Sequence, residues 1–251
     1  MEGHEQRYSR HVLLAMWGEE GQKRIEQGRA LVVGLGALGS LIAILLARAG
    51  IGFLRVADYD APELHNLHRQ ILYDEADTHS GRSKAEIAET RLCAAASQSV
   101  IEAVNVRVGP ETVRELIAGV DVVVDALDNI ESRYHVNDAI LDRGIPYVFG
   151  GAIETSGNVM TVIPGKTPCL RCLWPDPKTV MDHPRASDVG VLSSAATATA
   201  SMQVTETMKI LVGRQEDLID GLLVMDFWHG KFRVARVEPD PACKCRARER
   251  P

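Results

Sequence analysis

Three glycines at short spacing, followed by a single acid, are the first residues whose pattern could do chemistry. Gly34, Gly36 and Gly39 follow a β-branched run, and Asp58 stands 19 residues after Gly39, at the end of a second apolar run. In a strand–turn–helix unit, these glycines allow a tight turn, approach of the backbone to a phosphate, and packing of the helix on the sheet. The free amides of a helix that starts near Ala37 would face the anion, and Asp58 is placed to bind a ribose hydroxyl. The pattern predicts nucleotide binding; a glycine turn that serves only packing is the alternative.

Further polar residues follow predicted strands. Asp60 opens an irregular, proline-containing connection after the second strand, and Asp128 and Asn129 follow a buried β-branched strand at residues 120–126. Ligands in open α/β sheets bind outside the carboxyl ends of the strands. These residues are therefore candidates for the same site, and a helix cap is the structural alternative for Asp128 and Asn129.

The elements that could position these residues alternate between strand and helix. Unbroken β-branched runs are typical of buried parallel strands, and the alternation predicts a Rossmann-like, doubly wound, mostly parallel α/β sheet. Strands are predicted at residues 31–33, 53–57, 100–108, 120–126 and 146–150, with helices from residue 37 and at residues 83–97, 111–118 and 131–143. Ser83 and Glu86 have the spacing of a capping box.

The two ends of the chain have a different character. Residues 7–29 predict a helix, a break at Gly18 and a second short helix. Beyond residue 151, antiparallel strands are predicted at residues 157–164 and 222–237, and a helix at residues 195–212. Residues 168–188 contain four prolines and predict a mobile crossover loop.

Composition limits the class of protein. The chain has 251 residues, a net charge of −6 and an isoelectric point near 5.8, so no basic field suggests nucleic-acid binding. The first residues lack the apolar core of a signal peptide, and the longest apolar run, residues 41–47, is too short to span a bilayer. Five cysteines, four of them in two tight pairs, do not describe a secreted disulfide scaffold. We expect a soluble, cytoplasmic protein that binds no membrane.

Taken in order, the motifs resemble the ThiF/MoeB/HesA family, the bacterial relatives of ubiquitin-activating enzymes. The shared motifs are RYSRHVLL, GLGALG, DYD, HNLHRQ, SK, ALDN, CLRCLWPD and a terminal cysteine pair, and they span nearly the full length. The resemblance implies one adenylation domain over residues 1–251, with N-terminal helices at 1–29, a nucleotide-binding half at 30–150, and a carrier-binding and dimer half at 151–251 that contains the crossover loop at 168–188.

The resemblance also implies an activity. Family members bind Mg²⁺ and ATP and adenylate the C-terminal glycine of a ubiquitin-like sulfur carrier protein that ends in Gly-Gly, with release of pyrophosphate. On matching positions, Asp58 would hold the ribose and Asp128 the magnesium ion, while Arg10 would reach the phosphates of the other subunit in a homodimer. The implied catalytic residues are Arg10, Arg69, Lys84 and Asp128, and the implied nucleotide-contacting residues are Gly34, Gly36, Ala37, Gly39, Asp58, Asp60, Asn66, Arg69, Gln70, Lys84, Asp128 and Asn129.

These residue types suit the implied chemistry. Attack of a carboxylate on the α-phosphate brings one anion to another, so guanidinium groups, an ammonium group and Mg²⁺ must screen the charge. A general base is not required, because a C-terminal carboxylate is already ionised at neutral pH. Ala37 replaces the glycine that is more frequent in the family, which should be harmless because only its backbone amide is needed.

Two cysteine pairs, Cys169 with Cys172 and Cys243 with Cys245, have the composition of a four-thiolate structural zinc site. The second pair departs from the family, which usually has two residues between the cysteines. A pair with one intervening residue can still chelate, with a tighter bite. The alternative is four reduced thiols without a metal.

Covalent thiol chemistry is not supported by the sequence. Some relatives use a cysteine in the crossover loop, whereas this chain has no cysteine between Leu173 and Ala242. We expect Cys93, within an alanine-rich helix, to be a buried packing thiol. The sequence therefore predicts an enzyme that stops at the adenylate and leaves sulfur delivery to another protein.

Three other functions compete with this hypothesis. The same ATP site could act on a different carboxylate, of a peptide or a modified tRNA base. The acidic isoelectric point counts against the tRNA base, and the small size leaves no obvious domain to hold a peptide. An NAD-dependent dehydrogenase would explain Gly34 to Asp58 but would leave Arg69, Lys84 and Asp128 without a role. A non-catalytic dimeric scaffold would leave all the phosphate-binding residues unused. The sequence does not decide between a thiamine and a molybdopterin carrier, although CLRCLWPD is similar to the thiamine-pathway member.

Overall fold

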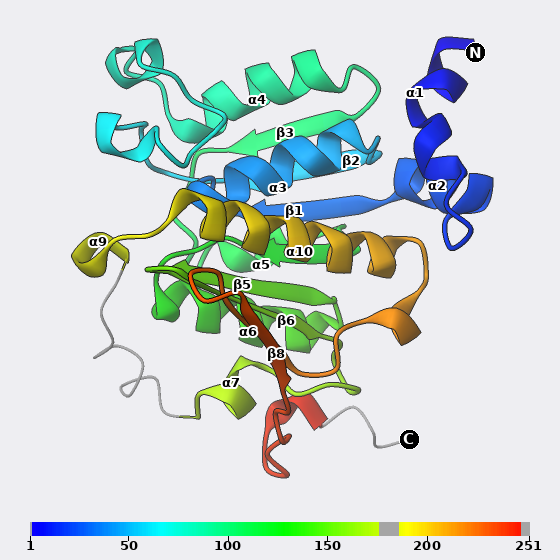
Figure 1. Cartoon of the computed structure of the whole chain (residues 1–251), viewed down its shortest axis with the longest axis vertical. Coiled ribbons are helices and arrows are strands. Elements are labelled where there is room, and N and C mark those ends of the chain that lie inside the picture. Colours follow the sequence, from blue (N-terminus) through cyan, green and yellow to red (C-terminus); the bar gives the residue numbers. More distant parts are fainter. Residues whose placement is uncertain (1, 176–185, 247–251) are drawn as a thin grey trace.

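In the computed structural model, which describes residues 2–175 and 186–246, one eight-stranded sheet runs through the molecule (Figure 1). Its strands lie in the order β3-β2-β1-β4-β5-β6-β7-β8. The strands are β1 (Arg29–Val33), β2 (Phe53–Ala57), β3 (Val100–Val104), β4 (Val122–Asp125), β5 (Tyr147–Ile153), β6 (Ser156–Val162), β7 (Leu222–Asp226) and β8 (Lys231–Ala235). β1 to β5 pair in parallel, whereas β5 to β8 pair antiparallel. The predicted mostly parallel sheet with an antiparallel continuation is confirmed.

The α-helices in the described residues are α1 (Glu2–Val12), α2 (Gly18–Gln27), α3 (Ala37–Arg48), α4 (Lys84–Ala95), α5 (Val113–Leu116), α6 (Ile130–Arg143), α7 (Leu170–Leu173), α9 (Ala186–Val189) and α10 (Ser193–Leu211). Seven of these nine described helices agree with the predicted ones to within about five residues, and the other two, α7 and α9, lie in or at the end of the predicted crossover loop. The predicted break at Gly18 is the point where α2 begins, and Gly18 has a positive φ of 61°. The predicted strand at residues 100–108 is shorter than expected, since β3 ends at Val104.

Helices cover both faces of the sheet and create two cores. Ala30 and Val32 of β1 belong to the core under α3, α4 and α10, whereas Leu31 and Val33 belong to the core under α5 and α6. This alternation follows from the two-residue period of a strand. Figure 1 shows α3 and α10 in front of the sheet and α5 and α6 behind it. A strand covered on both faces must be apolar throughout, which explains the unbroken β-branched runs.

The strand order reverses between β1 and β4, because β2 and β3 lie on one side of this pair and β5 lies on the other. Such a reversal opens a crevice at the carboxyl ends of the two strands, where open α/β sheets bind ligands. α3 begins directly after β1 and α6 shortly after β4. The amino ends of both helices therefore face the same edge of the sheet.

The predicted crossover loop lies only partly within the described residues. α7 and α9 occupy its two ends, and residues 176–185 lie outside the description. Glu154, in the turn between β5 and β6, holds the second end: its backbone N–H donates to the Gly190 carbonyl at 2.9 Å, and its carbonyl accepts from the Leu192 N–H at 2.7 Å. The start of α10 is thereby fixed against the antiparallel part of the sheet.

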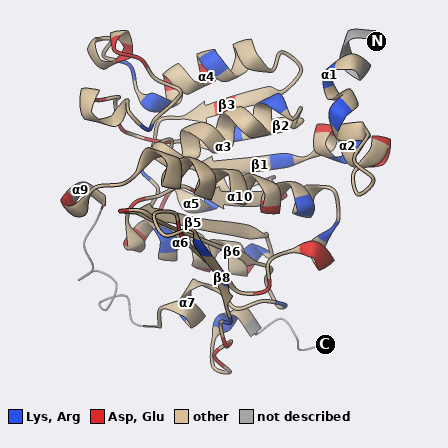
Figure 2. Cartoon of the chain, in the orientation of Figure 1, with Lys and Arg blue, Asp and Glu red and all other residues tan. Residues whose placement is uncertain are grey.

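Charged residues are distributed over the whole structure. Figure 2 shows basic and acidic residues interspersed among the elements, without a continuous basic stripe. Within residues 2–175 and 186–246, each helix is too short or too polar to cross a bilayer.

The expectation for Cys93 is wrong. We expected a buried thiol, but Cys93 is exposed. α4 packs Ala85, Ala88 and Leu92 into the core, and Cys93 follows Leu92 by one position, which turns its side chain about 100° away from that face. Alanine-rich helices have little amphipathic contrast, so the buried face was not evident in the sequence.

Candidate active site

The glycine turn between β1 and α3 forms the floor of the candidate site. Gly34 has a positive φ of 88°, and a Cβ there would lie 2.6 Å from the carbonyl oxygen of Ala126. A Cβ on Gly39 would lie 1.9 Å from the carbonyl oxygen of Gly34, so both glycines are required by packing. By contrast, the nearest atom to a Cβ on Gly36 would be Nε2 of Gln70, at 3.7 Å. Packing therefore does not require glycine at position 36, and the open space beside it can admit a phosphate.

Asp58, at the end of β2, is bound to this turn. Its Oδ2 accepts a hydrogen bond from the Leu35 N–H at 2.6 Å, and its Oδ1 accepts one from the Asp60 N–H at 2.8 Å. Burial raises the pKa of the Asp58 carboxyl, and the charge of Lys84 offsets part of this effect. Asp58 thus lies where a ribose ligand is expected, and a carboxylate with two accepted bonds still has lone pairs for a hydroxyl.

The segment after β2 carries three more predicted residues, of which Gln70 lies beside Gly36. Arg69 donates from Nη2 to Oδ1 of Asn66 at 3.0 Å and from Nη1 to the carbonyl of His65 at 3.0 Å. Burial lowers the pKa of the Arg69 guanidinium, and partial desolvation also strengthens its attraction for an anion. Gln70 is only 4% exposed, and its Oε1 has no hydrogen-bond partner among the described residues. A buried, unpaired amide oxygen is rare in folded proteins, and a ligand that donates a hydrogen bond would explain it.

Lys84 enters the site at the amino end of α4. Its side chain is 6% exposed, and Nζ lies 3.3 Å from Oδ2 of Asp60, which is 49% exposed. The predicted capping box is confirmed: Glu86 Oε2 accepts from the Ser83 N–H at 2.7 Å, and Ser83 Oγ accepts from the Glu86 N–H at 3.3 Å. The cap fixes the helix start, so Lys84 is held as a buried ammonium group close to the Asp58 carboxylate.

Asp128 and Asn129 lie in the connection between β4 and α6. The cap interpretation is correct for Asn129, whose Oδ1 accepts from the Ser132 N–H at 2.9 Å. Asp128 is exposed, and its Oδ1 lies 3.5 Å from Nδ2 of Asn129. The carboxylates of Asp60 and Asp128 both raise the pKa of Tyr59, Asp60 more strongly. Both acids therefore lie near one phenol at the carboxyl edge of the sheet.

A buried charge network that sequence reasoning missed fixes the end of β4. Asp125 is fully buried; its Oδ2 accepts from the Tyr147 hydroxyl at 2.7 Å and lies 3.1 Å from Nε of Arg133. Burial raises the pKa of Asp125, and the Arg133 charge offsets part of this. From α10, Gln203 donates to the Asp125 carbonyl at 2.6 Å. The signal was an acid inside a β-branched run, because a buried charge needs a partner.

Arg10 lies far from the other predicted site residues of its own chain. α1 packs against the carboxyl ends of α3 and α4, where Tyr8 fills the space beside Gly50 and Arg7 donates to the carbonyl of Ala95. The glycine turn is at the opposite end of α3, about 18 Å away by the length of a 12-residue helix. Arg10 is exposed, and its guanidinium forms no hydrogen bond or ion pair with any other described residue.

A groove of about 870 Å³ opens beside Arg69. One wall is the start of α10, which is uncharged over its first turns (Figure 2). The other wall comes from β7, β8 and the residues between them. Representative lining residues are Ser193, Ser194 and Thr197 on the first wall and Met225, Phe227 and Phe232 on the second. The groove is therefore polar at its small residues, apolar on the opposite side, and cationic at Arg69.

The four predicted zinc ligands come together on the other face of the sheet. The Sγ atoms of Cys169, Cys172, Cys243 and Cys245 all lie within 4.8 Å of one another. Two Sγ–Sγ distances are 3.5 Å, close to the roughly 3.8 Å between sulfurs of a tetrahedral zinc site with Zn–S bonds of about 2.3 Å. The Asp240 N–H also donates to the sulfur of Cys172 at 3.4 Å. The cluster fits a zinc ion, and the single residue between Cys243 and Cys245 does not prevent convergence.

We expect about one zinc ion per chain in freshly purified protein, measured by elemental analysis. Cys169→Ser should lower the free energy of unfolding by roughly 3 kcal/mol, about a quarter of the 10–16 kcal/mol typical of a structural zinc, since metal binding adds to folding. The matched control is Cys93→Ser, which removes an exposed thiol outside the cluster and should change neither quantity. Metal-free protein of unchanged stability would exclude the zinc site.

Comparisons with known proteins identify the family. Residues 8–247 match the model of the ThiF family. A sulfur carrier protein ThiS adenylyltransferase of Bacillus subtilis is 37% identical over 248 residues, which are 98% of this chain and 73% of that protein. A sulfur carrier protein adenylyltransferase of Thermus thermophilus is 36% identical over 242 residues, 94% of this chain and 89% of that protein.

Among solved structures, the crystal structure of E. coli MccB with MccA-N7isoASN has the same fold. The TM-score is 0.83 at 20% sequence identity, over 96% of this chain and 74% of that chain. At this identity the structural match shows only that the fold is shared, whereas the family model and the two relatives match the amino-acid sequence. Together with the convergence of the motif residues on one edge of the sheet, they show that the chain belongs to the ThiF family.

Proposed function

We propose that the protein is an ATP-dependent adenylyltransferase that activates the C-terminal carboxylate of a ubiquitin-like sulfur carrier protein and releases pyrophosphate. The names of the relatives in Bacillus subtilis and Thermus thermophilus support this substrate class. The observation that carries the proposal is a set of contacts that runs from the glycine turn through Asp58 and Asp60 to Lys84. On the other side of the turn, Gln70 lies beside Gly36, and its neighbour Arg69 lines a groove that is open to a second reactant.

The proposed roles follow from charge and position. The Gly36 backbone and the amino end of α3 receive phosphate oxygens, and Asp58 accepts a ribose hydroxyl. Arg69, which lines the groove, and Lys84, which lies near the Asp58 carboxylate, screen the negative charge while the carrier carboxylate attacks the α-phosphorus and pyrophosphate leaves. The guanidinium can form two parallel hydrogen bonds to phosphate, whereas the ammonium acts as a point charge.

Magnesium is part of the proposal. Mg²⁺ prefers oxygen ligands and is usually held by one or two carboxylates together with phosphates and water. Asp128 is an exposed carboxylate at the edge where the phosphates would lie, and it is the residue that we assign to the metal. The ion would neutralise charge that develops on the pyrophosphate.

The groove is proposed to receive the carrier's C-terminal tail. A tail that ends in Gly-Gly has no side chains near its carboxylate and can enter between the small residues of α10 and the apolar side chains of β7 and β8. Arg69 also lines the groove, so its charge is available to an incoming carboxylate. The apolar wall, which includes the 60% exposed Phe232, would contact the body of the carrier.

We also propose a homodimer in which Arg10 acts in the partner's site. Arg10 is remote from its own glycine turn, exposed, and carried by a helix at the opposite edge of the sheet (Figure 1). A phosphate-binding role for Arg10 therefore requires a second copy of the chain.

Pyrophosphate exchange tests the proposed function. We expect labelled pyrophosphate to enter ATP only when Mg²⁺ and a sulfur carrier ending in Gly-Gly are both present, because exchange requires the reversible acyl-adenylate. A carrier that lacks its last glycine is the control and should give no exchange. Carriers of the thiamine and molybdopterin pathways should be compared. Exchange driven by a short peptide but by neither carrier would favour a different carboxylate substrate and contradict the proposal.

A further inference from the structure

Leu35, between the first two glycines of the turn, is held at both of its backbone groups. Its N–H donates to Oδ2 of Asp58 at 2.6 Å, and its carbonyl accepts a hydrogen bond from the hydroxyl of Tyr73 at 3.0 Å. The Leu35 side chain is fully buried as well. Tyr73 lies 38 residues further along the chain, in the segment between Arg69 and α4. The conformation of the glycine turn is therefore fixed in part by Tyr73, a residue from a distant segment of the chain.

The geometry of the peptide group gives this hydrogen bond a consequence. The Leu35 carbonyl and the Gly36 N–H belong to the same planar trans peptide, so they point in opposite directions. When Tyr73 holds the carbonyl, the Gly36 N–H must point away from the Tyr73 hydroxyl. Among the described residues, none accepts a hydrogen bond from that N–H. It is available to an anion, and its direction is set by Tyr73.

The Tyr73 hydroxyl is suited to be a permanent donor. The side chain is buried, and this burial raises the pKa of the phenol far above its usual value, so the proton stays on the oxygen at neutral pH. The hydroxyl also lies 3.5 Å from the carbonyl of Lys84. A single O–H donates best to one acceptor, and the shorter distance identifies Leu35.

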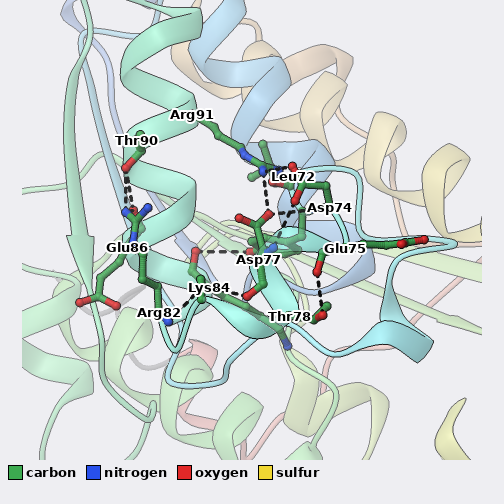
Figure 3. A network of polar contacts seen from close by, with 12 residues as sticks. Leu72, Asp74, Glu75, Asp77, Thr78, Arg82, Lys84, Glu86, Thr90 and Arg91 are labelled. Atoms are coloured by element: carbon green, nitrogen blue, oxygen red, sulfur yellow. Dashed lines mark hydrogen bonds and ion pairs between the residues drawn. The ribbon is translucent and has the colours of Figure 1, made fainter.

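A second network fixes the backbone on both sides of Tyr73 (Figure 3). From α4, Arg91 donates to the carbonyl of Leu72, and its Nη2 lies 2.6 Å from Oδ2 of both Asp74 and Asp77. The two aspartates also bind each other's backbone N–H groups, at 2.8 and 3.1 Å. Arg91 thereby ties Leu72 and Asp74, the neighbours of Tyr73, to the helix whose first residue is Lys84.

We propose that Tyr73 is a positioning residue for phosphate binding, and that Arg91 supports it. Tyr73 acts through the Leu35–Gly36 peptide, whose N–H it directs toward the nucleotide phosphates. The inference rests on the proposed ATP site and adds a residue that favours ligands with phosphates over ligands without them. A purely structural role, in which the hydroxyl only satisfies a buried carbonyl, would lower stability without a selective loss of phosphate binding.

Tyr73→Phe is the decisive variant, because it removes the hydroxyl and keeps the ring. We expect the KM for ATP in carrier-dependent exchange to rise about tenfold, since a buried carbonyl loses its partner and the peptide can rotate, while kcat changes less than about twofold. The inhibition constant of adenosine, which has no phosphates, should stay unchanged. A fold-wide loosening would weaken ATP and adenosine alike.

Tyr134→Phe is the matched control. The hydroxyl of this buried tyrosine also binds a main-chain carbonyl, that of Trp174 at 2.5 Å, but on the zinc-cluster side of the sheet. Tyr134→Phe should lose about as much thermal stability as Tyr73→Phe and keep the wild-type KM for ATP.

Arg91→Met is the second variant, for the case in which Tyr73→Phe folds poorly. It should also raise the KM for ATP, but by a smaller factor than Tyr73→Phe. The double variant should raise the KM by less than the product of the two single-variant factors, because both residues act through the same backbone element. The inference is overturned if either single variant keeps a wild-type KM for ATP, or weakens ATP and adenosine equally. Wild-type protein that neither binds ATP nor exchanges pyrophosphate would instead refute the proposed function, and the inference with it.

Discussion

Asp128→Ala is expected to reduce carrier-dependent pyrophosphate exchange by at least about 1,000-fold, because the variant loses the carboxylate assigned to Mg²⁺ at the site of charge development. The fold should be unaffected. Asp128 is exposed, and the contact of its carboxylate with the side chain of Asn129 is long, at 3.5 Å. Exposed substitutions of this kind usually change the free energy of unfolding by less than about 0.5 kcal/mol. The rate of pyrophosphate exchange should therefore fall steeply, while the melting temperature should stay close to that of the wild type.

The control for this prediction is Glu131→Ala, which removes an exposed acid three residues further along, in the first turn of α6. It changes the local charge by the same amount and should retain activity. A magnesium titration adds a second readout: Asp128→Asn, which keeps one oxygen ligand, should need a higher Mg²⁺ concentration for its residual activity. Full activity of Asp128→Ala at ordinary Mg²⁺ concentrations would remove the metal role from this residue.

The parts of the fold that the sequence predicted well are those set by local patterns. The glycine turn, the capping box at Ser83 and Glu86, and the β-branched strands each depend on residues within one or two elements. Alternation of strands and helices then restricts the topology, because parallel strands must be joined by crossovers. The carboxyl-edge site followed from this topology without knowledge of any long-range contact.

The parts that could not be predicted depend on contacts between distant segments. No motif in the sequence marks Tyr73, and its bond to Leu35 is visible only in three dimensions. The partners of Asp125 lie on α6 and β5, although its place in an apolar run showed that a partner must exist. Gln70 was predicted as a site residue, but its unpaired buried oxygen, the observation that best supports a ligand, depends on packing.

Cys93 shows how a wrong burial prediction affects a mechanistic one. Since the thiol is exposed, access alone does not exclude it from covalent chemistry. Its position does count against such a role: it lies nine residues after Lys84 on α4, about 13 Å along the helix from the site. A thiol in transfer chemistry must reach the acyl-adenylate. The prediction that the enzyme stops at the adenylate therefore rests on the distance of Cys93 from the site and no longer on its burial.

Arg10→Ala and Asp128→Ala should each be inactive alone and should recover activity when mixed. In a dimer whose sites combine Arg10 of one chain with Asp128 of the other, a mixed dimer has one intact site and one doubly defective site. Random exchange gives equal numbers of mixed and unmixed dimers, so about a quarter of all sites should be restored. The physical reason is the position of α1, whose contacts with Gly50 and Ala95 hold Arg10 at the opposite edge of its own sheet.

Arg7→Ala provides the control within the same helix. Arg7 donates to the carbonyl of Ala95 in its own chain, so its loss should weaken the attachment of α1 without removing a group from the partner's site. This variant should keep much of its activity alone, and its mixture with Asp128→Ala should equal the sum of the separate activities. Subunit exchange must be verified by co-purification of two differently tagged chains. If exchange is complete and the Arg10→Ala and Asp128→Ala mixture stays inactive, Arg10 has no role in the partner's site, and the exposed guanidinium on α1 needs another explanation.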